Sequence, residues 1–199
     1  MACDIAKGRK EPCKDVVGGI KNLYFVNYGD LGTVSITDDA TGEEITNITG
    51  YTGDVVGDLT CYKYEVKGNS SLEQTVNSSR ENGTTFYEQT LNLTLKKLSK
   101  LDNKELKLMA YGRPHVVVED YNGNYMMVGL EHGADVSGGT VVTGAAMGDL
   151  SGYTLTLTAM EKTPANFMTV DSTAALFPFS EFAGLTGTPA ATITAGTNS

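Results

Sequence analysis

The clearest pattern in this chain is an alternation of apolar and polar residues from Thr85 to Lys96. Four large residues share one face of the alternation: Tyr87, Leu91, Leu93 and Leu95. The other face carries the polar residues Glu88, Thr90, Asn92, Thr94 and Lys96. Because successive side chains of a strand point to opposite faces, a period of two over this length predicts a half-buried antiparallel β-strand.

Further strands are predicted before this one. Residues 20–28 and 33–37 are rich in β-forming residues, and residues 59–67 alternate with Tyr62, Tyr64 and Val66 on one face. Residues 71–79 are the expected partner strand of 59–67. Between residues 38 and 58 the chain is acidic and punctuated by glycine, which predicts a long loop or a hairpin.

A hairpin and a closing strand are predicted after the alternating strand. Residues 115–119 and 124–130 flank Asp120-Tyr121-Asn122-Gly123, and Asn-Gly is typical of tight β-turns. Glycine-rich strands are expected within residues 133–148. Residues 153–160 alternate again, with Tyr153, Leu155 and Leu157 facing inward and Thr154, Thr156 and Thr158 facing outward.

One short helix is predicted at about residues 102–111. Asp102 and Glu105 have the spacing of a capping box, and Gly112 followed by Pro114 ends the pattern. Its apolar stripe is Leu106, Met109 and Ala110. A helix of this length needs a sheet to pack against. The fold class is therefore predicted to be mainly β: an antiparallel β-sandwich or barrel with one flanking helix and extended terminal arms.

The chain divides into three parts by composition. Residues 1–19 form a polar, basic N-terminal arm, residues 20–164 form the β core, and residues 165–199 form an Ala/Thr/Gly/Ser-rich C-terminal arm. An apolar cluster between Leu176 and Phe182 lies in the second arm. We expect these aromatic residues to dock either on the core or on a neighbouring molecule.

Charge is spread unevenly along the chain, whose formal net charge is −9. Residues 1–22 carry five basic and three acidic residues, so the remainder carries −11. The segment 30–58 has seven acidic residues and no Lys or Arg. Such a surface repels phosphates and argues against tight DNA or RNA binding. It is either a solvated acidic loop or a wall past which DNA slides without sticking.

Cysteine usage and hydropathy indicate synthesis in a reducing compartment. Cys3, Cys13 and Cys61 are odd in number and lack metal-type spacing. The residues after Met1 contain no apolar run, so no secretory signal is expected. No segment has the ~20 apolar residues of a membrane span. We therefore expect cytoplasmic synthesis without membrane insertion.

The sequence contains few motifs typical of catalysis, metal binding or phosphate binding. Glu131-His132-x-x-Asp135 groups three metal-ligand types, but on a strand the two adjacent residues would face opposite ways, so a polar turn is the preferred interpretation. The glycines of 138–144 lack the ending of a phosphate loop and are expected to allow close approach between strands or between subunits. Cys61 is expected to be a structural cysteine. No catalytic residue, cofactor or metal site is predicted.

Several stretches resemble phage virion proteins. They are Gly112-Arg113-Pro114-His115, Val118-Glu119-Asp120, Asn122-Gly123-Asn124-Tyr125, Gly129-Leu130-Glu131-His132-Gly133-Ala134, and the run from Gly139 to Tyr153. Together with the order of strands, helix, hairpin and closing strand, residues 88–165 resemble the tail tube family of long-tailed bacteriophages, which is related to type VI secretion tube proteins.

The resemblance implies a function without catalysis. It implies a virion protein that stacks as rings, hexameric in this family, to form a conduit for DNA ejection. Its partners would be its own copies and other tail proteins such as sheath, neck or baseplate, with DNA passing through unbound. The lumen wall is typically acidic, and Asp38, Asp39, Glu43 and Glu44 are candidates for it. The terminal arms would bridge neighbouring subunits or rings.

Two other classes remain open. A neck, tail-terminator or capsid-decorating protein would share the virion context without forming a tube. A carbohydrate- or protein-binding β-sandwich would use the outward threonine rows and the 10 tyrosines, although Trp, the usual platform for sugars, is absent from the chain.

Overall fold

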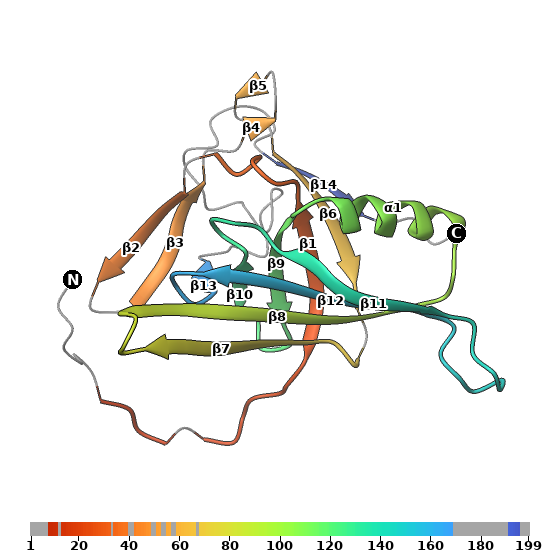
Figure 1. The fold of residues 1–199 in the computed structure, drawn as a ribbon, viewed down its shortest axis with the longest axis horizontal. Coiled ribbons are helices and arrows are strands. Elements are labelled where there is room, and N and C mark those ends of the chain that lie inside the picture. Colours follow the sequence, from red (N-terminus) through yellow and green to blue (C-terminus); the bar gives the residue numbers. More distant parts are fainter. Residues whose placement is uncertain are drawn as a thin grey trace.

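The computed structural model confirms a mainly β fold of two large sheets, one helix and a small two-stranded sheet (Figure 1). It describes residues 8–11, 13–32, 34–39, 42–48, 51–52, 55–56, 59–66, 68–168 and 191–195. The two large sheets pack face to face. Apolar residues from both sheets form one buried cluster between them, including Leu23 and Val116 from one and Leu93 and Leu157 from the other.

The larger sheet has eight strands in the order β14-β6-β1-β9-β10-β13-β3-β2. In chain order these are β1 (Ile20–Val26), β2 (Val34–Asp39), β3 (Gly42–Ile48), β6 (Leu59–Glu65), β9 (His115–Asp120), β10 (Tyr125–Val128), β13 (Asn166–Met168) and β14 (Ala191–Ala195). Most neighbours are antiparallel, but β13 pairs with β3 and β14 with β6 in parallel.

The smaller sheet has four antiparallel strands in the order β11-β12-β8-β7. They are β7 (Ser71–Ser79), β8 (Thr84–Lys96), β11 (Asp135–Val142) and β12 (Gly152–Glu161). The short strands β4 (Tyr51–Thr52) and β5 (Val55–Val56) pair with each other.

The alternating segment forms β8, as the sequence predicts, and this strand is central in its sheet. Leu91 and Leu93 are buried against the larger sheet, whereas the polar residues of the other face are exposed or half-buried. Gln89 lies on the buried face, and both ends of its amide are bonded: the oxygen accepts from the Gly129 N–H at 3.0 Å, and the nitrogen donates to the Thr163 carbonyl at 3.3 Å. Both bonds tie β8 to neighbouring loops.

The central strand β1 of the larger sheet is buried on both faces. Leu23 and Phe25 face the four-stranded sheet, while Tyr24 and Val26 belong to a second buried cluster on the opposite face. That second cluster also takes residues from β3, β6, β9, β10 and β13. A strand buried on both sides needs no alternation, which explains its continuous run of large residues.

The predicted pairing of residues 71–79 with 59–67 is wrong. β7 instead forms a hairpin with β8 through a turn in which Gly83 adopts φ +62°, and β6 is paired on its two sides by β1 and β14. The local connection brings β7 to β8 at little cost in chain entropy.

The hairpin predicted around residues 120–123 is confirmed, with a three-residue connection. The Asp120 N–H donates to the Asn124 carbonyl at 3.0 Å, and Gly123 adopts φ +82°. The Asp120 carboxylate accepts from the backbone N–H groups of Asn122 and Asn124, both at 2.8 Å. Asp, Asn and Gly therefore each have a defined place in this turn.

Helix α1 spans Lys100–Tyr111 and begins two residues earlier than predicted. Its N-cap is Ser99, whose hydroxyl accepts from the Asp102 N–H at 3.0 Å and donates to the Asp102 carboxylate at 2.6 Å. Asp102 is therefore the third helical residue of the capping box, not the cap. Leu106 and Met109 face inward as predicted, but Ala110 is exposed.

Helix α1 lies at one end of the space between the sheets (Figure 1). The Tyr153 hydroxyl of β12 donates to the Ser99 carbonyl at 3.1 Å, and Leu106 lines a groove with residues of β11 and β12. Burial, followed by the charges of Glu105 and Asp102, raises the pKa of Tyr64 on β6 to about 12. The helix thus contacts the smaller sheet and approaches the edge of the larger one.

The two predicted arms differ in how they meet the core. Residues 13–19 are exposed, and Asn122 ties Val17 to the β9–β10 turn through two hydrogen bonds of 2.9 and 2.8 Å. In the C-terminal segment, β13 and β14 pair with strands of the larger sheet. The predicted docking cluster at 176–182 lies outside the described residues.

Candidate functional site

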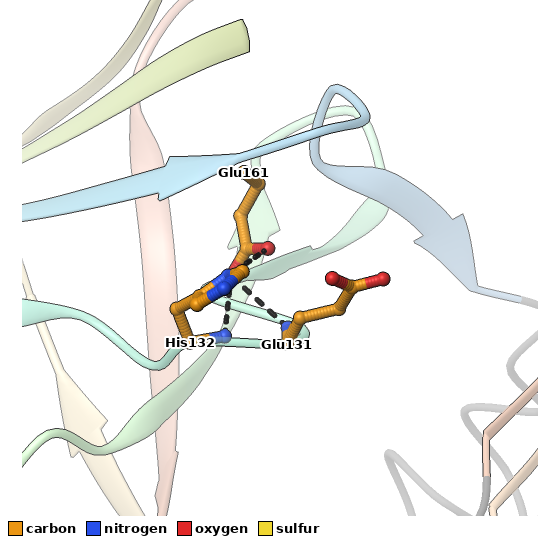
Figure 2. Close-up of side chains that lie close together, drawn as sticks. All are labelled: Glu131, His132 and Glu161. Carbon is orange, nitrogen blue, oxygen red and sulfur yellow. Dashed lines mark hydrogen bonds and ion pairs between the residues drawn. The ribbon is translucent and has the colours of Figure 1, made fainter.

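One histidine, His132, lies in a group of metal-ligand-type side chains. Glu131 and His132 lie on a turn after β10, not on a strand, and their backbone segments lie beside Glu161 (Figure 2). Asp135 begins β11 and is not part of the group; its place is taken by Glu161, at the end of β12. One ligand-type atom from each of Glu131, His132 and Glu161 lies within 4.8 Å of the others.

The buried carboxylate of Glu161 holds this turn together. Its Oε1 accepts from the backbone N–H groups of Glu131 and His132, at 3.0 and 2.8 Å. Its Oε2 lies 3.1 Å from Nδ1 of the His132 ring. Because a buried carboxylate requires such partners, these contacts account for the burial of Glu161.

The group contains atoms that could bind a metal ion, but its side chains also have other contacts. Imidazole and carboxylate groups are common ligands of zinc-type ions. In Figure 2 the Glu131 carboxylate points away from the other two side chains, and its Oε2 lies 3.4 Å from the Lys162 ammonium. Each side chain is therefore engaged in local contacts that hold the turn, which agrees with the polar turn preferred from the sequence.

The second histidine, His115, is buried in a different setting. Its Nδ1 contacts the Gly129 carbonyl, and its Nε2 accepts from the Gly29 N–H at 3.4 Å, which fits a neutral ring. Burial lowers the pKa of His115 below its usual 6.5. The His115 ring stacks on the Tyr28 ring, with the two centroids 5.2 Å apart. The Arg113 guanidinium lies 4.2 Å from the centroid of the same Tyr28 ring.

A buried polar network surrounds Glu119 at the other end of β9. Its carboxylate accepts from Lys21 Nζ and Asn22 Nδ2, each at 2.6 Å, and from the Tyr24 hydroxyl at 3.1 Å. Burial alone would raise the pKa of Glu119, but the hydrogen bonds and the Lys21 charge hold it below its usual 4.5. The network joins β1 to β9 and approaches Tyr125 on β10.

Residues 112–115 and 129–134 meet at one end of the β9–β10 hairpin, and residues 118–125 form its other end. At one end Arg113-Pro114 packs against Gly133-Ala134: the Ala134 N–H donates to the Pro114 carbonyl at 2.9 Å. A Cβ on Gly133 would lie 2.3 Å from the Arg113 carbonyl, so only glycine fits. At the other end the Glu119 network adjoins the Asp120–Asn124 turn. These residues therefore have structural roles, because they connect neighbouring segments of the fold.

The glycine-rich segment and the buried cysteine are also structural. Gly139 lies in β11, where a Cβ would come within 2.6 Å of the Thr154 carbonyl, which confirms the expected close approach between strands. Cys61 is buried on β6, and burial raises the pKa of its thiol to about 12. A thiol in that environment is a poor nucleophile.

The outer face of the four-stranded sheet is a broad polar surface. Its hydroxyl groups pair across the strands: Thr140 with Thr154 at 2.6 Å, Ser137 with Thr158 at 2.9 Å, and Thr156 with Asn92 at 3.0 Å. Strand alternation places the carboxylates of Glu73, Glu88 and Asp135 on the same face. Lys96 lies at the end of β8.

The acidic residues proposed for a lumen wall lie elsewhere, on the β2–β3 hairpin at the edge of the larger sheet. Asp38 stands directly opposite Glu43 in the register, and Glu44 lies opposite Thr37. Asp39 pairs with Gly42 at the turn. The side chains of Glu43 and Glu44 are exposed. The structure thus separates two acidic surfaces, the hairpin and the outer face of the smaller sheet.

Comparisons with known proteins found no matching family model, no matching curated protein and no matching solved structure. Within the described ranges, no helix is long and apolar enough to cross a membrane.

Proposed function

We propose that this chain is a non-enzymatic structural subunit that assembles with its own copies into rings and a hollow tube, as phage tail tube proteins do. The virion is then its place of action, and DNA passes through without specific binding. The observation that carries the proposal is the four-stranded sheet, which combines two edge strands of matching length with a polar, acidic outer face.

The edges of this sheet suit a closed ring. Among the described residues β7 and β11 each pair on one side only, and they have nine and eight residues. With four strands in antiparallel order, the two edge strands run in opposite directions. Copies related by rotation could therefore place β11 beside the β7 of the next copy, and the antiparallel pattern would continue around the ring.

The outer face of the same sheet suits the wall of a DNA conduit. Its hydroxyl groups bond to one another across strands, so they offer few free donors to a phosphate backbone. Its carboxylates, Glu73, Glu88 and Asp135, repel phosphate. A surface of this kind would let DNA pass without retaining it.

The same observations weigh against a carbohydrate-binding module. Sugar sites need free hydrogen-bonding groups beside an aromatic platform. Here the threonine rows are engaged with each other, and the exposed aromatic residue in the described part of this face is Phe86, near one end of β8. A neck or terminator protein would use the same edges to close a ring but would not stack further.

The proposal predicts that a lysine at the β7 edge blocks ring closure without unfolding the protein. Val76 is 58% exposed on β7, so Val76→Lys is expected to change the free energy of unfolding by less than about 0.5 kcal/mol. Charged edge strands resist pairing with other chains. Sedimentation velocity should show assemblies for the wild type and small particles for this variant.

The matched control is Asn82→Lys, which adds the same charge in the exposed β7–β8 turn. It should assemble like the wild type. Wild-type assembly by Val76→Lys would contradict pairing through the β7 edge.

A further inference from the structure

Helix α1 presents a basic and apolar face to solvent. Leu101, Lys104, Leu108 and Tyr111 follow one another at spacings that place them on one side of the helix, and all four are exposed. The segment 96–107 holds five of the chain's 15 Lys and Arg residues and only two acidic ones. Among the described residues, Lys100, Lys104 and Lys107 form no ion pair. In a chain of net charge −9, this face is a local positive patch.

Exposed leucines on such a face indicate a protein contact. Leu101 and Leu108 are 50% and 53% exposed, and Tyr111 is 79% exposed. Beside this face, a groove of about 280 Å³ between α1 and β11 is lined by Leu106 and Lys107 of the helix and by residues of β11 and β12. Apolar residues surrounded by charges are typical of interaction surfaces.

The β2–β3 hairpin carries the complementary charge. The whole segment 30–58 has seven acidic residues and no basic one. Asp38 stands opposite Glu43 in the strand register, and the Glu43 side chain is exposed. The apolar side chain of Ile36, on the same face of the hairpin as Glu43, is also exposed.

We propose that the α1 face of one copy docks on the β2–β3 hairpin of a second copy. The two surfaces lie on opposite sides of the molecule along its longest axis (Figure 1), so one copy cannot satisfy both within itself. Lysines of α1 meet the Glu43 carboxylate, and the exposed leucines and Tyr111 meet Ile36, which lies on the same face of the hairpin as Glu43. The contact is head-to-tail, and each copy uses both surfaces.

This inference rests on the proposed function, because it names one contact between copies of the assembly. It is separate from the β7–β11 contact, since it uses the larger sheet and the helix. A contact of opposite charges also predicts that assembly weakens as salt increases.

Charge reversal with rescue tests the contact. Lys104→Glu and Glu43→Lys, each on an exposed side chain, are each expected to weaken self-association about tenfold at low salt. The double variant, which restores opposite charges, should return to near the wild-type value. Arg80→Glu, an equal change of charge in the exposed β7–β8 turn, is the control and should have little effect. Sedimentation velocity at low and high salt measures all five proteins.

The outcomes separate the two proposals. Loss in both single variants with recovery in the double variant supports the docking contact, and if those assemblies are neither rings nor tubes, the tube function is overturned while the contact stands. Unchanged association in both single variants overturns the docking contact and leaves the tube function in place. Wild-type protein that stays monomeric at every concentration overturns both.

Discussion

Leu93→Asp is expected to abolish folding. Leu93 is 2% exposed at the centre of the four-stranded sheet, where it packs in the cluster between the two sheets. A carboxylate there would lose its hydration without gaining a partner, at a cost on the order of 5 kcal/mol or more. That is comparable with the whole stability of a typical domain. Circular dichroism and the soluble yield on expression measure the result.

The neighbouring position provides a matched control. Asn92→Asp adds the same carboxylate one residue away, on the outer face, and keeps an oxygen to accept from the Thr156 hydroxyl. This variant should fold with nearly wild-type stability. A folded, soluble Leu93→Asp protein would mean that the two faces of β8 are reversed.

Glu119→Ala is expected to destabilise the protein by about 3 kcal/mol. The substitution removes the common acceptor of Lys21, Asn22 and Tyr24, and the last two are buried. Glu131→Ala is the control, because its carboxylate pairs with Lys162 on the surface and should contribute less than about 1 kcal/mol. Urea unfolding of the three proteins measures both differences; equal stability of Glu119→Ala and wild type would contradict the network's role.

The Glu119 carboxylate should make the free energy of unfolding depend on pH in the acidic range. The pKa of Glu119 is lower in the folded protein than its usual 4.5, so its stabilising contribution is present above pH 4.5 and is lost as the pH falls through the folded pKa. Glu119→Gln cannot titrate and should show a shallower loss of stability below pH 4.5. Asp120, whose pKa is also lowered, contributes equally to both proteins, so the difference isolates Glu119.

Local patterns in the sequence were sufficient to predict elements with one solvated face. The alternation in β8 and β12 and the Asp-x-Asn-Gly turn predict the right strands and the right hairpin because each depends on residues close in the chain. The pairing of β7 was mispredicted because strand partners are set by the whole sheet. The cap at Ser99 was missed because Asp102 has the same chemistry three residues later.

The buried polar residues and their partners are harder to predict from the sequence. Glu161 continues the inward face of β12 after Tyr153, Leu155, Leu157 and Ala159, so its position could have marked it as buried and paired. Its partners at residues 131 and 132 could not be read from the sequence, because they are brought near by the β10 turn. Glu119 likewise lies within an apolar strand, but its donors come from β1, about a hundred residues earlier.

We propose that this protein assembles with itself into a hollow tube, and negative-stain electron microscopy of the purified wild-type protein across a concentration series is the decisive test. The proposal predicts rings at low concentration and hollow tubes of uniform diameter as the concentration rises. Small particles of one size at every concentration would contradict it and would direct attention to a monomeric binding module.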